Sequence, residues 1–406
     1  MTPEVPRYVR FLDRMLVPPF EKIARQTGQA DIPVPTLSPG VLWEGVLTGW
    51  SGYAKANREI LFRVANRLHV ELRHVFRASW SCDPVDARLS VHERLRVAPS
   101  CPFLRFFGPD AYDIPEGRFR IAYTMMETEI VHPDMVSEIN ARYDELWTPT
   151  SWNAGTFKGS GVKIPIRVMP LGVDPLVYRP IRGAELPGYH PLSRGAAGSR
   201  PSGFVFLSVG LPSFRKGFDL LASAFEEAFA GDEGAALVCA VTHATSNTET
   251  LSGCAGMKSR IYALEGPRDE HGMAHVYSAS SAYVTCSRGE GFNLPLVEAA
   301  ACGLPVICPR NTTHEEVVGR DAFFFDPEGT ATAPGAEKVS PWYEGMPFSA
   351  FGRRSRGQLV ELLRHVRQDS IGVRETASRL KKRVRESLTW DRAATLVSRR
   401  LLEVQG

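Results

Sequence analysis

The stretch SRGEGFNLPLVE (residues 287–298) decides how this 406-residue chain is interpreted. An apolar run, SAYVTC (281–286), precedes it, and an alanine-rich run ending at Gly303 follows it. This order predicts a strand, a loop and a short helix beginning near Leu294, because Pro suits the first helical turn and Gly the position after the last. The free backbone N–H groups at such a helix start suit a phosphate or a diphosphate.

Two carboxylates, Glu290 and Glu298, flank this predicted anion site. An ionised carboxylate accepts hydrogen bonds and donates none, so hydroxyl groups are its natural ligands. A nucleotide sugar offers both a diphosphate and many hydroxyls, which would explain acidic residues beside an anion site. The alternative is that both glutamates are solvent-exposed helix residues.

A second loop, VGLPSFRKG (209–217), also follows an apolar run and precedes a predicted helix over 218–229. It carries the adjacent cations Arg215 and Lys216. These two groups could clamp a diphosphate leaving group. The alternative is a pair of surface cations.

Apolar runs alternate with helical patterns in both halves of the chain, which predicts α/β folding with parallel sheets covered on both faces. The length also fits two domains. Ligands of such sheets bind beyond the carboxyl ends of the strands. The strand candidates are 41–47, 70–76, 118–126, 145–150 and 166–172 in the first half, and 204–210, 236–242, 259–264, 281–286, 304–308 and 322–326 in the second.

The stretch 179–203 is rich in Pro, Gly, Ser and Arg and has no periodicity, so we expect an interdomain linker there. The predicted organisation is an N-terminal extension (1–40), a first Rossmann-like domain (41–183), a linker (184–203), a second Rossmann-like domain (204–388) and a C-terminal helix (389–406).

Residues 204–326 resemble the donor domain of retaining glycosyltransferases of the GT-B fold, family four, also called glycosyl transferases group 1. The family's Glu-x7-Glu motif matches Glu290 and Glu298, and its basic pair matches Arg215 and Lys216. The resemblance implies two Rossmann-like domains facing a central cleft, acceptor-binding first and nucleotide-sugar-binding second, with the C-terminal helix (389–406) crossing back to the first domain. It also implies that Glu290 contacts the donor sugar, that Glu298 holds the ribose hydroxyls, and that the cations stabilise the leaving nucleoside diphosphate.

The same resemblance, which extends weakly into the first half, supplies further substrate-binding candidates. The loop TGWSGYA (48–54) is similar to the family's glycine-rich loop, which approaches the donor phosphates, although a plain strand–helix turn would also explain it. Asn293 stands where the family often has glycine, and asparagine accepts unusual backbone angles better than most residues. The implied binding residues are Gly49, Ser51, Gly52, Gly210, Leu264, Gly291, Phe292, Asn293, Leu294 and Glu298.

The acceptor side has a weaker signature. Many family members place a histidine there, and this chain shows no clear equivalent; Glu127 resembles a Glu-Thr pair of one branch and is expected to face the acceptor. His132 follows at a predicted helix start, and both residues could instead form a capping or exposed polar cluster. Two other functions stay open: an inverting enzyme that uses Glu127 or His132 as base, and an inactive protein that binds sugar nucleotides.

The expected reaction is transfer of a sugar from a UDP- or GDP-sugar to a hydroxyl of a glycan or lipid-linked acceptor, with no cofactor, metal or nucleic acid. The chain contains no Asp-x-Asp, the simplest motif for a metal–diphosphate site. The family resemblance implies that basic residues and helix dipoles replace the cation.

Charge and composition add expectations about location. Residues 351–406 carry 14 Lys+Arg against 6 Asp+Glu, so these predicted helices could touch the inner face of a membrane or simply be solvated. No apolar run reaches the length of a membrane-spanning helix and the N-terminus lacks a signal-peptide core, which predicts a cytoplasmic protein. Seven dispersed cysteines without a C-x-x-C pair predict free thiols.

Overall fold

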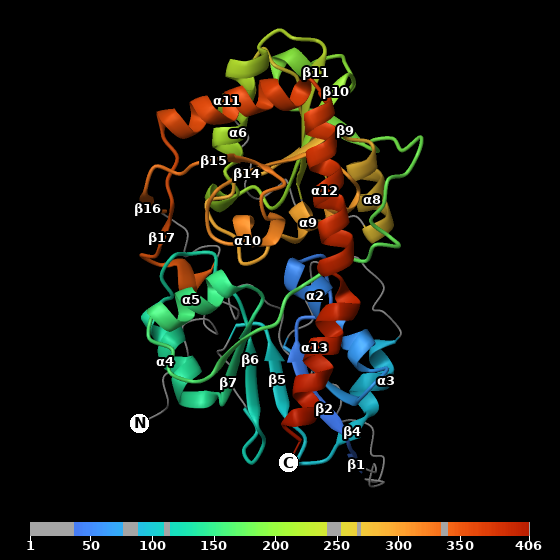
Figure 1. The fold of residues 1–406 in the computed structure, drawn as a ribbon, viewed down its shortest axis with the longest axis vertical. Coiled ribbons are helices and arrows are strands. Elements are labelled where there is room, and N and C mark those ends of the chain that lie inside the picture. The colour runs from blue at the N-terminus through green and yellow to red at the C-terminus, as the bar shows by residue number, and fades with distance from the viewer. Residues whose placement is uncertain are drawn as a thin grey trace, which may run out of the picture.

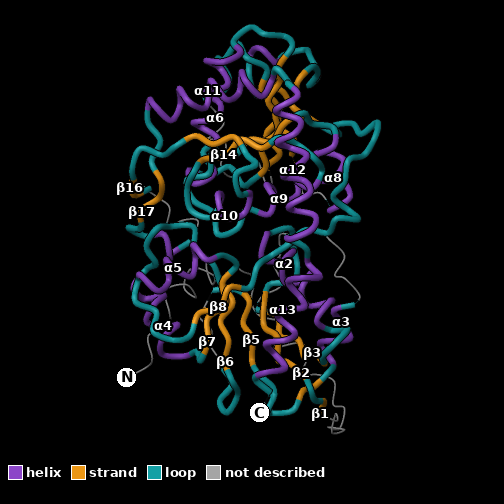
Figure 2. Tube along the Cα trace, viewed as in Figure 1, coloured by secondary structure: helices purple, strands orange, loops and turns teal. Residues whose placement is uncertain are grey.

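The computed structural model describes residues 36–75, 88–108, 114–241, 253–265, 269–333 and 340–405. Most of the predicted N-terminal extension, 1–40, lies outside the described residues. Figure 1 shows two lobes, each built around a sheet with helices packed beside it. Figure 2 shows the strands of the first sheet running toward the second lobe.

The first sheet is parallel throughout, in the order β3-β2-β5-β6-β7-β8. β5, which the apolar patterns did not predict, lies between β2 and β6 and completes the sheet. The strands are β2 (Gly40–Gly45), β3 (His69–His74), β5 (Phe103–Phe106), β6 (Arg120–Tyr123), β7 (Glu145–Thr148) and β8 (Ile166–Val168), beside the short pair β1 (Thr36–Leu37) and β4 (Arg96–Val97).

The second sheet has the order β15-β14-β13-β10-β11-β12-β9, and all of its pairs are parallel except that of β9 with β12. Two doubly wound sheets were predicted, and both are present. The strands are β9 (Tyr189–Pro191), β10 (Phe204–Val209), β11 (Ala235–Val241), β12 (Ile261–Glu265), β13 (Ala282–Val284), β14 (Val306–Pro309) and β15 (Phe323–Phe325). A separate antiparallel hairpin joins β16 (Thr330–Thr332) to β17 (Pro347–Ser349).

The helices follow the apolar spacing of the sequence. α6 covers the predicted range 218–229, and the stripe of apolar residues at 373, 377, 380 and 384 is the buried face of α12. The described helices are α2 (Gly52–Val64), α3 (Leu89–Arg94), α4 (Pro133–Arg142), α5 (Ser151–Gly159), α6 (Phe218–Phe229), α8 (Glu270–Ser278), α9 (Leu294–Ala301), α10 (His314–Val318), α11 (Arg353–Arg367), α12 (Ile371–Ser387) and α13 (Trp390–Glu403), with short 3-10 turns η3 (Arg194–Ala196), η4 (Phe214–Lys216) and η6 (Pro341–Tyr343).

Part of the predicted linker belongs to the second domain. β9 extends the second sheet at its β12 edge, and the Ser193 hydroxyl accepts from Ile261 N at 3.0 Å while donating to the Ser259 carbonyl at 2.6 Å. Residues 189–196, which fall in the predicted linker 184–203, therefore pack as part of the second domain. A three-residue strand is too short to show periodicity, so tertiary pairing alone reveals it.

The two chain segments that connect the domains touch each other. Val173, after β8, donates from its N–H to the carbonyl of Leu388, just before α13, at 2.9 Å. Gly172 lies against the backbone of Thr389 and Trp390 so closely that a Cβ would overlap it. α13 then packs beside α2 in the first domain (Figure 1), where the Trp390 side chain is fully buried.

Two composition-based expectations are met among the described residues. The six described cysteines are free and buried. Among the described helices, none is both long and apolar enough to cross a bilayer.

Because the crossing at Gly172 has no room for a methyl group, we expect Gly172→Ala to destabilise the fold by at least about 2 kcal/mol, as overpacking does. Gly155→Ala is the matched control: Gly155 lies inside α5 with open space around its Cβ direction, so alanine should be neutral or add up to about 1 kcal/mol. Urea unfolding of both variants measures the difference, and equal stability would contradict the packing at Gly172.

Candidate active site at the domain interface

The predicted loops meet at the switch points of the two sheets. In the second sheet β10 and β13 are neighbours whose connections run to opposite sides, and the loops 210–217 and 285–293 follow these two strands. In the first sheet β2 and β5 have the same relation, and the glycine-rich loop follows β2. Ligands of doubly wound sheets bind at such points.

The centre of the site is an ion cluster around Glu290. Lys216 Nζ lies 2.6 Å from Oε1 of Glu290, and Arg215 Nη1 lies 3.1 Å from Oε2. The Arg215 guanidinium also donates to the carbonyl of Gly289 at 2.8 Å. Gly210 leaves room for the Lys216 chain, because a Cβ there would sit 3.1 Å from its carbons. The structure thus brings together the carboxylate and both cations singled out in the sequence.

In this cluster, the carboxylate and the two cations favour each other's ionised forms. Burial alone would raise the pKa of Glu290, but the adjacent Lys216 and Arg215 outweigh it and hold that pKa at about 2. Burial works against the Arg215 cation as well, and the Glu290 carboxylate raises its pKa above the ordinary value. For Lys216 burial is the larger effect and lowers the pKa. Glu290 is therefore ionised at neutral pH although only 5% exposed.

α9 begins as the sequence predicts. Asn293 caps it in the left-handed region (φ 71°, ψ 67°), and its Oδ1 accepts from Leu296 N at 3.3 Å. Pro295 lies in the first turn and Gly303 follows the helix at φ 91°. The backbone N–H groups of residues 291–294 have no acceptor within the described part of the chain. This helix start can therefore offer several N–H groups to an anion.

A buried histidine fixes the orientation of the Asn293 amide. Asn311 Nδ2 donates to the Ser287 carbonyl at 3.0 Å, which leaves Asn311 Oδ1 to accept from Nδ1 of His314 at 2.8 Å. Burial lowers the pKa of His314 to about 4, so its ring is neutral and Nε2 accepts from Asn293 Nδ2 at 3.0 Å. No sequence pattern predicts this chain of hydrogen bonds, since its members come from α10 and two loops.

The loop 285–293 of the second domain packs directly against the first domain. A Cβ on Gly289 would overlap the carbonyl oxygen of Glu127, and one on Gly291 would lie 2.5 Å from Met125 Cγ. Asn153 of the first domain donates to the Gly291 carbonyl at 3.0 Å. The predicted cleft is therefore an interface here, and the two glycines permit the contact.

Glu298 is also paired across this interface. Its Oε1 lies 2.7 Å from Lys55 Nζ of α2, and its Oε2 accepts from the Tyr277 hydroxyl at 2.8 Å. Lys55 donates in addition to the Tyr178 hydroxyl at 2.7 Å. Sequence reasoning missed Lys55 and both tyrosines, because each occupies an ordinary position in a helix or connection and no motif marks it.

The glycine-rich loop of the first domain lies opposite the start of α9. Gly49 has a φ of 89° and its carbonyl accepts from Arg58 at 2.9 Å. Ser51 caps α2, and Gly52 is its first residue. A Cβ on Gly52 would lie 3.7 Å from Leu294, the first residue of α9. Both helix starts therefore face the same region.

Three predicted binding residues bury their side chains in the hydrophobic core: Leu264 in β12, Phe292 and Leu294. Only their backbone atoms are available to a ligand. The sequence also predicts that a nucleotide base lies against the loop around Leu264–Pro267, and residues 266 and 267 of that loop are outside the described residues.

On the acceptor side, Glu127 faces the basic pair and its Oε2 accepts from the Tyr343 hydroxyl at 2.7 Å. His132 caps α4 by accepting from Asp134 N at 3.2 Å, and its ring packs edge-on to Trp342. These contacts agree with the alternative interpretation of His132 as a helix cap. Tyr343 was not predicted, because it comes from an irregular segment of the other domain.

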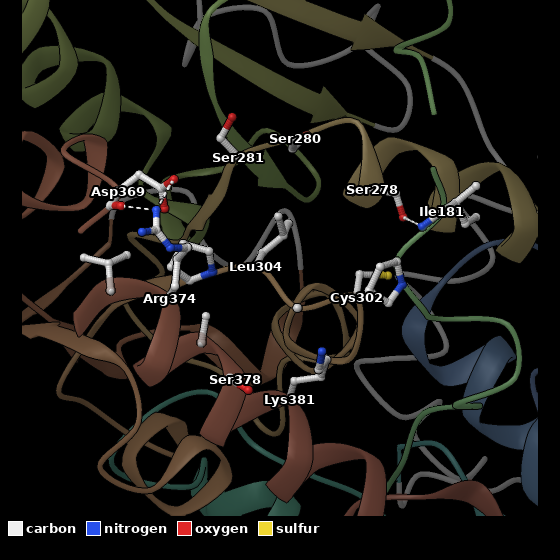
Figure 3. A pocket seen from close by; sticks show the side chains of 15 residues that line it. Ile181, Ser278, Ser280, Ser281, Cys302, Leu304, Asp369, Arg374, Ser378 and Lys381 are labelled. Atoms are coloured by element: carbon white, nitrogen blue, oxygen red, sulfur yellow. Dashed lines mark hydrogen bonds and ion pairs between the residues drawn. The ribbon is translucent and has the colours of Figure 1, made fainter. Parts of the chain in front are cut away.

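The pocket of Figure 3, about 330 Å³ in volume, is separate from this site. It lies at the C-terminal end of α9, where Cys302, Ser278 and Lys381 surround it, while Glu290 precedes the N-terminal end. Figure 3 also shows Arg374 engaged with Asp369. Among the described residues, no group of three or more His, Cys, Asp or Glu side chains could hold a metal ion.

Part of the chain that holds these residues matches a known family model. Residues 203–339, about a third of the chain, match the family model of glycosyl transferases group 1. This range contains the ion cluster, Asn293 and Glu298. The family resemblance predicted from the two loops is confirmed for this part of the chain.

Relatives in sequence match short stretches. The serotype-specific mannosyltransferase WbdA of Escherichia coli is 31% identical over 140 residues, which are 34% of this chain and 17% of that protein. The O-antigen chain mannosyltransferase B of the same organism is 42% identical over 55 residues, 14% of each chain. The D-inositol 3-phosphate glycosyltransferase of Frankia alni is 31% identical over 151 residues, 35% of each. The chain thus spans about a third or less of these curated relatives.

Similarity to solved structures covers both domains. HepE of Anabaena in complex with UDP and glucose superposes with a TM-score of 0.63 at 12% identity, over 90% of this chain and 99% of that one. Sucrose-phosphate synthase of Thermosynechococcus elongatus gives 0.62 at 14% identity, over 90% and 98%. WaaG, a glycosyltransferase involved in lipopolysaccharide biosynthesis, gives 0.60 at 14%, over 89% and 99%. The chain has the predicted GT-B fold.

The low pKa of Glu290 predicts a pH dependence of stability. A carboxylate with a folded-state pKa of about 2 stabilises the fold above its ordinary value of 4.5, and this contribution is lost as the pH falls toward 2. A shift of this size corresponds to about 3 kcal/mol. Wild type should therefore lose free energy of unfolding more steeply below pH 4.5 than Glu290→Gln does.

Urea unfolding between pH 6 and pH 3 measures this difference. Glu386→Gln is the control. Glu386 is exposed on α12, so this variant should have the same pH profile of stability as wild type. Parallel profiles for wild type and Glu290→Gln would contradict the buried ion cluster.

Proposed function

We propose that this protein is a retaining glycosyltransferase that moves a sugar from a UDP- or GDP-sugar to a hydroxyl of a glycan or lipid-linked acceptor. The observation that carries the proposal is the buried cluster of Glu290, Arg215 and Lys216 beside the unpaired N–H groups that start α9. Cations and N–H groups suit a diphosphate, and a carboxylate between them suits sugar hydroxyls.

Donor binding would exchange the partners of these charges. In the structure the Glu290 carboxylate pairs with the Arg215 and Lys216 cations. A bound diphosphate brings its own negative charge to the cations, which frees lone pairs of Glu290 for hydroxyl donors. The site thus keeps its charges compensated with and without donor, and no buried charge is left alone.

Bond breaking places negative charge on the leaving diphosphate oxygen. Arg215, Lys216 and the N–H groups of residues 291–294 are fixed before the reaction and would stabilise that charge as it develops. Water is excluded because Gly289 and Gly291 lie directly against the first domain. Same-face attack by the acceptor hydroxyl, with the leaving phosphate accepting its proton, requires no metal and no covalent enzyme intermediate.

Glu298 would hold the ribose hydroxyls of the donor. Its carboxylate is anchored by Lys55 from one domain and Tyr277 from the other, so it is oriented only when both domains are in contact. Each oxygen retains a lone pair for a hydroxyl.

The names of three relatives support the proposed acceptor class. Two of them are named as mannosyltransferases, one of these of an O-antigen chain, and a third as a glycosyltransferase acting on inositol 3-phosphate. We therefore place this chain in glycan synthesis. Mannose and glucose linked to GDP or UDP are the donors to screen first, by the thermal stabilisation that each ligand confers.

We also propose that the basic C-terminal helices contact an anionic membrane surface. The structure limits which of their cations are available for this contact. Nine of the 14 cations in residues 351–406 bond to carboxylates or carbonyls of the protein: Arg354, Arg356, Arg364, Arg367, Arg374, Arg379, Arg383, Arg385 and Arg400. The cations left for an anionic surface are Arg353, Lys381, Lys382, Arg392 and Arg399.

Replacing Lys216 by alanine should lower kcat at least about 100-fold, because one of the two cations facing the leaving group is removed. The control is Lys382→Ala, an exposed lysine on α12 whose loss should leave turnover unchanged. Circular dichroism checks that both variants fold, and release of nucleoside diphosphate measures turnover. Near-normal activity of Lys216→Ala would overturn the proposal.

Retention can be tested on the product. With the donor that stabilises the protein most, we expect the new glycosidic bond to keep the anomeric configuration of the donor, as read by NMR. The opposite configuration would favour the inverting alternative. In that case Glu127 is the better base, because His132 Nδ1 is engaged in capping α4.

A further inference from the structure

A segment of the second domain lies over the first domain beside the candidate site. It comprises residues 340–350, with η6 and β17, and we call it the strap. Figure 1 shows β16 and β17 on the side of the second domain that lies next to α5 of the first. Ser349 N donates to the Arg288 carbonyl at 3.0 Å in the second domain, and Glu129 N of the first domain donates to Pro347 O at 3.3 Å. The strap therefore bonds to both domains.

Aromatic side chains anchor the strap on the first domain. Trp342, Tyr343 and Phe348 are at most 8% exposed. They share one hydrophobic cluster with Met126, Val131 and other residues of the first domain. Because these rings are already buried, the strap is held in place without any help from the Tyr343 hydroxyl.

That hydroxyl makes a specific polar contact instead. It donates to Oε2 of Glu127 at 2.7 Å, and the ionised carboxylate can only accept. Glu127 Oε1 has no hydrogen-bond partner among the described residues. Both Tyr343 and Glu127 act electrostatically on Arg215, so they lie close to the ion cluster.

We propose that Tyr343 is a positioning residue for Glu127: the strap of the donor domain fixes one carboxylate oxygen and thereby aims the other at the acceptor. This inference rests on the proposed function, and it assigns a role to a segment that the resemblance to known enzymes leaves without one. The hydrogen bond joins two domains, so it exists only when they are in contact. Glu127 is then oriented for an acceptor only in the assembled site.

The test compares acceptor-dependent turnover in variants that remove the hydroxyl alone. Tyr343→Phe should lower kcat/KM for the acceptor at least 10-fold while the Kd for the nucleoside diphosphate stays within 2-fold, because the cations and α9 are untouched. In a Glu127→Ala background the same substitution should cause no further loss, since nothing is left to position.

Tyr262→Phe is the matched control. It removes another partly buried tyrosine hydroxyl, which lies 2.6 Å from Ser199 Oγ in the second domain, away from the interface. It should leave kcat/KM unchanged in both backgrounds.

Two results would overturn the inference while leaving the proposed function standing. One is an equal loss from Tyr343→Phe with and without Glu127, and the other is a weaker Kd for nucleotide with unchanged acceptor kinetics. A Tyr343→Phe protein that fails to fold, by circular dichroism, would also overturn it, because the hydroxyl would then be structural. If wild type binds no nucleoside diphosphate and transfers no sugar, the proposed function itself fails.

Discussion

The arrangement of the site depends on one steric constraint, the direct contact between the glycine loop of the second domain and the turn after β6 in the first. Side chains at positions 289 and 291 would overlap the Glu127 carbonyl and Met125. With glycine there, the domains touch, and Glu290 lies buried between its two cations. The electrostatics follow from the packing, since charges paired outside water attract more strongly and cost more to leave unpaired.

The parts of the site that follow strands in the sequence were predictable, and the parts that come from elsewhere were not. The start and end of α9 are predictable from local backbone chemistry alone, through Pro295, Gly303 and the left-handed Asn293. By contrast, β5 was missed because its four residues include Arg105, which is buried through an ion pair with Glu44 that only the fold brings near. Lys55 lies 243 positions in sequence from its partner Glu298, and Tyr343 lies 216 positions from its partner Glu127. No local pattern encodes such distances.

The C-terminal charge excess changes its meaning once the partners are known. Arg400 reaches Glu145, a carboxylate 1% exposed in the first domain, and Arg385 donates to the carbonyl of Tyr178 in the segment that connects the domains. A basic terminal region therefore binds the two domains together, where the sequence alone suggested an external surface. The excess positive charge of residues 351–406 is compensated by carboxylate and carbonyl groups from earlier in the chain. A charge count of this region alone does not include those groups.

The contacts between the domains are of two kinds. One kind is polar: Lys55 bonds to Glu298, and Glu316 accepts from the backbone N–H groups of Ser151 and Trp152 at 2.7 and 2.9 Å. Each of these hydrogen bonds involves a charged group and contributes about 1.5–3 kcal/mol. The strap is apolar: exposing the rings of Trp342, Tyr343 and Phe348 would cost roughly 1.5–3 kcal/mol for each. Separating the domains at either kind of contact therefore costs a similar free energy for each group exposed, so charge pairing and apolar burial together hold the interface.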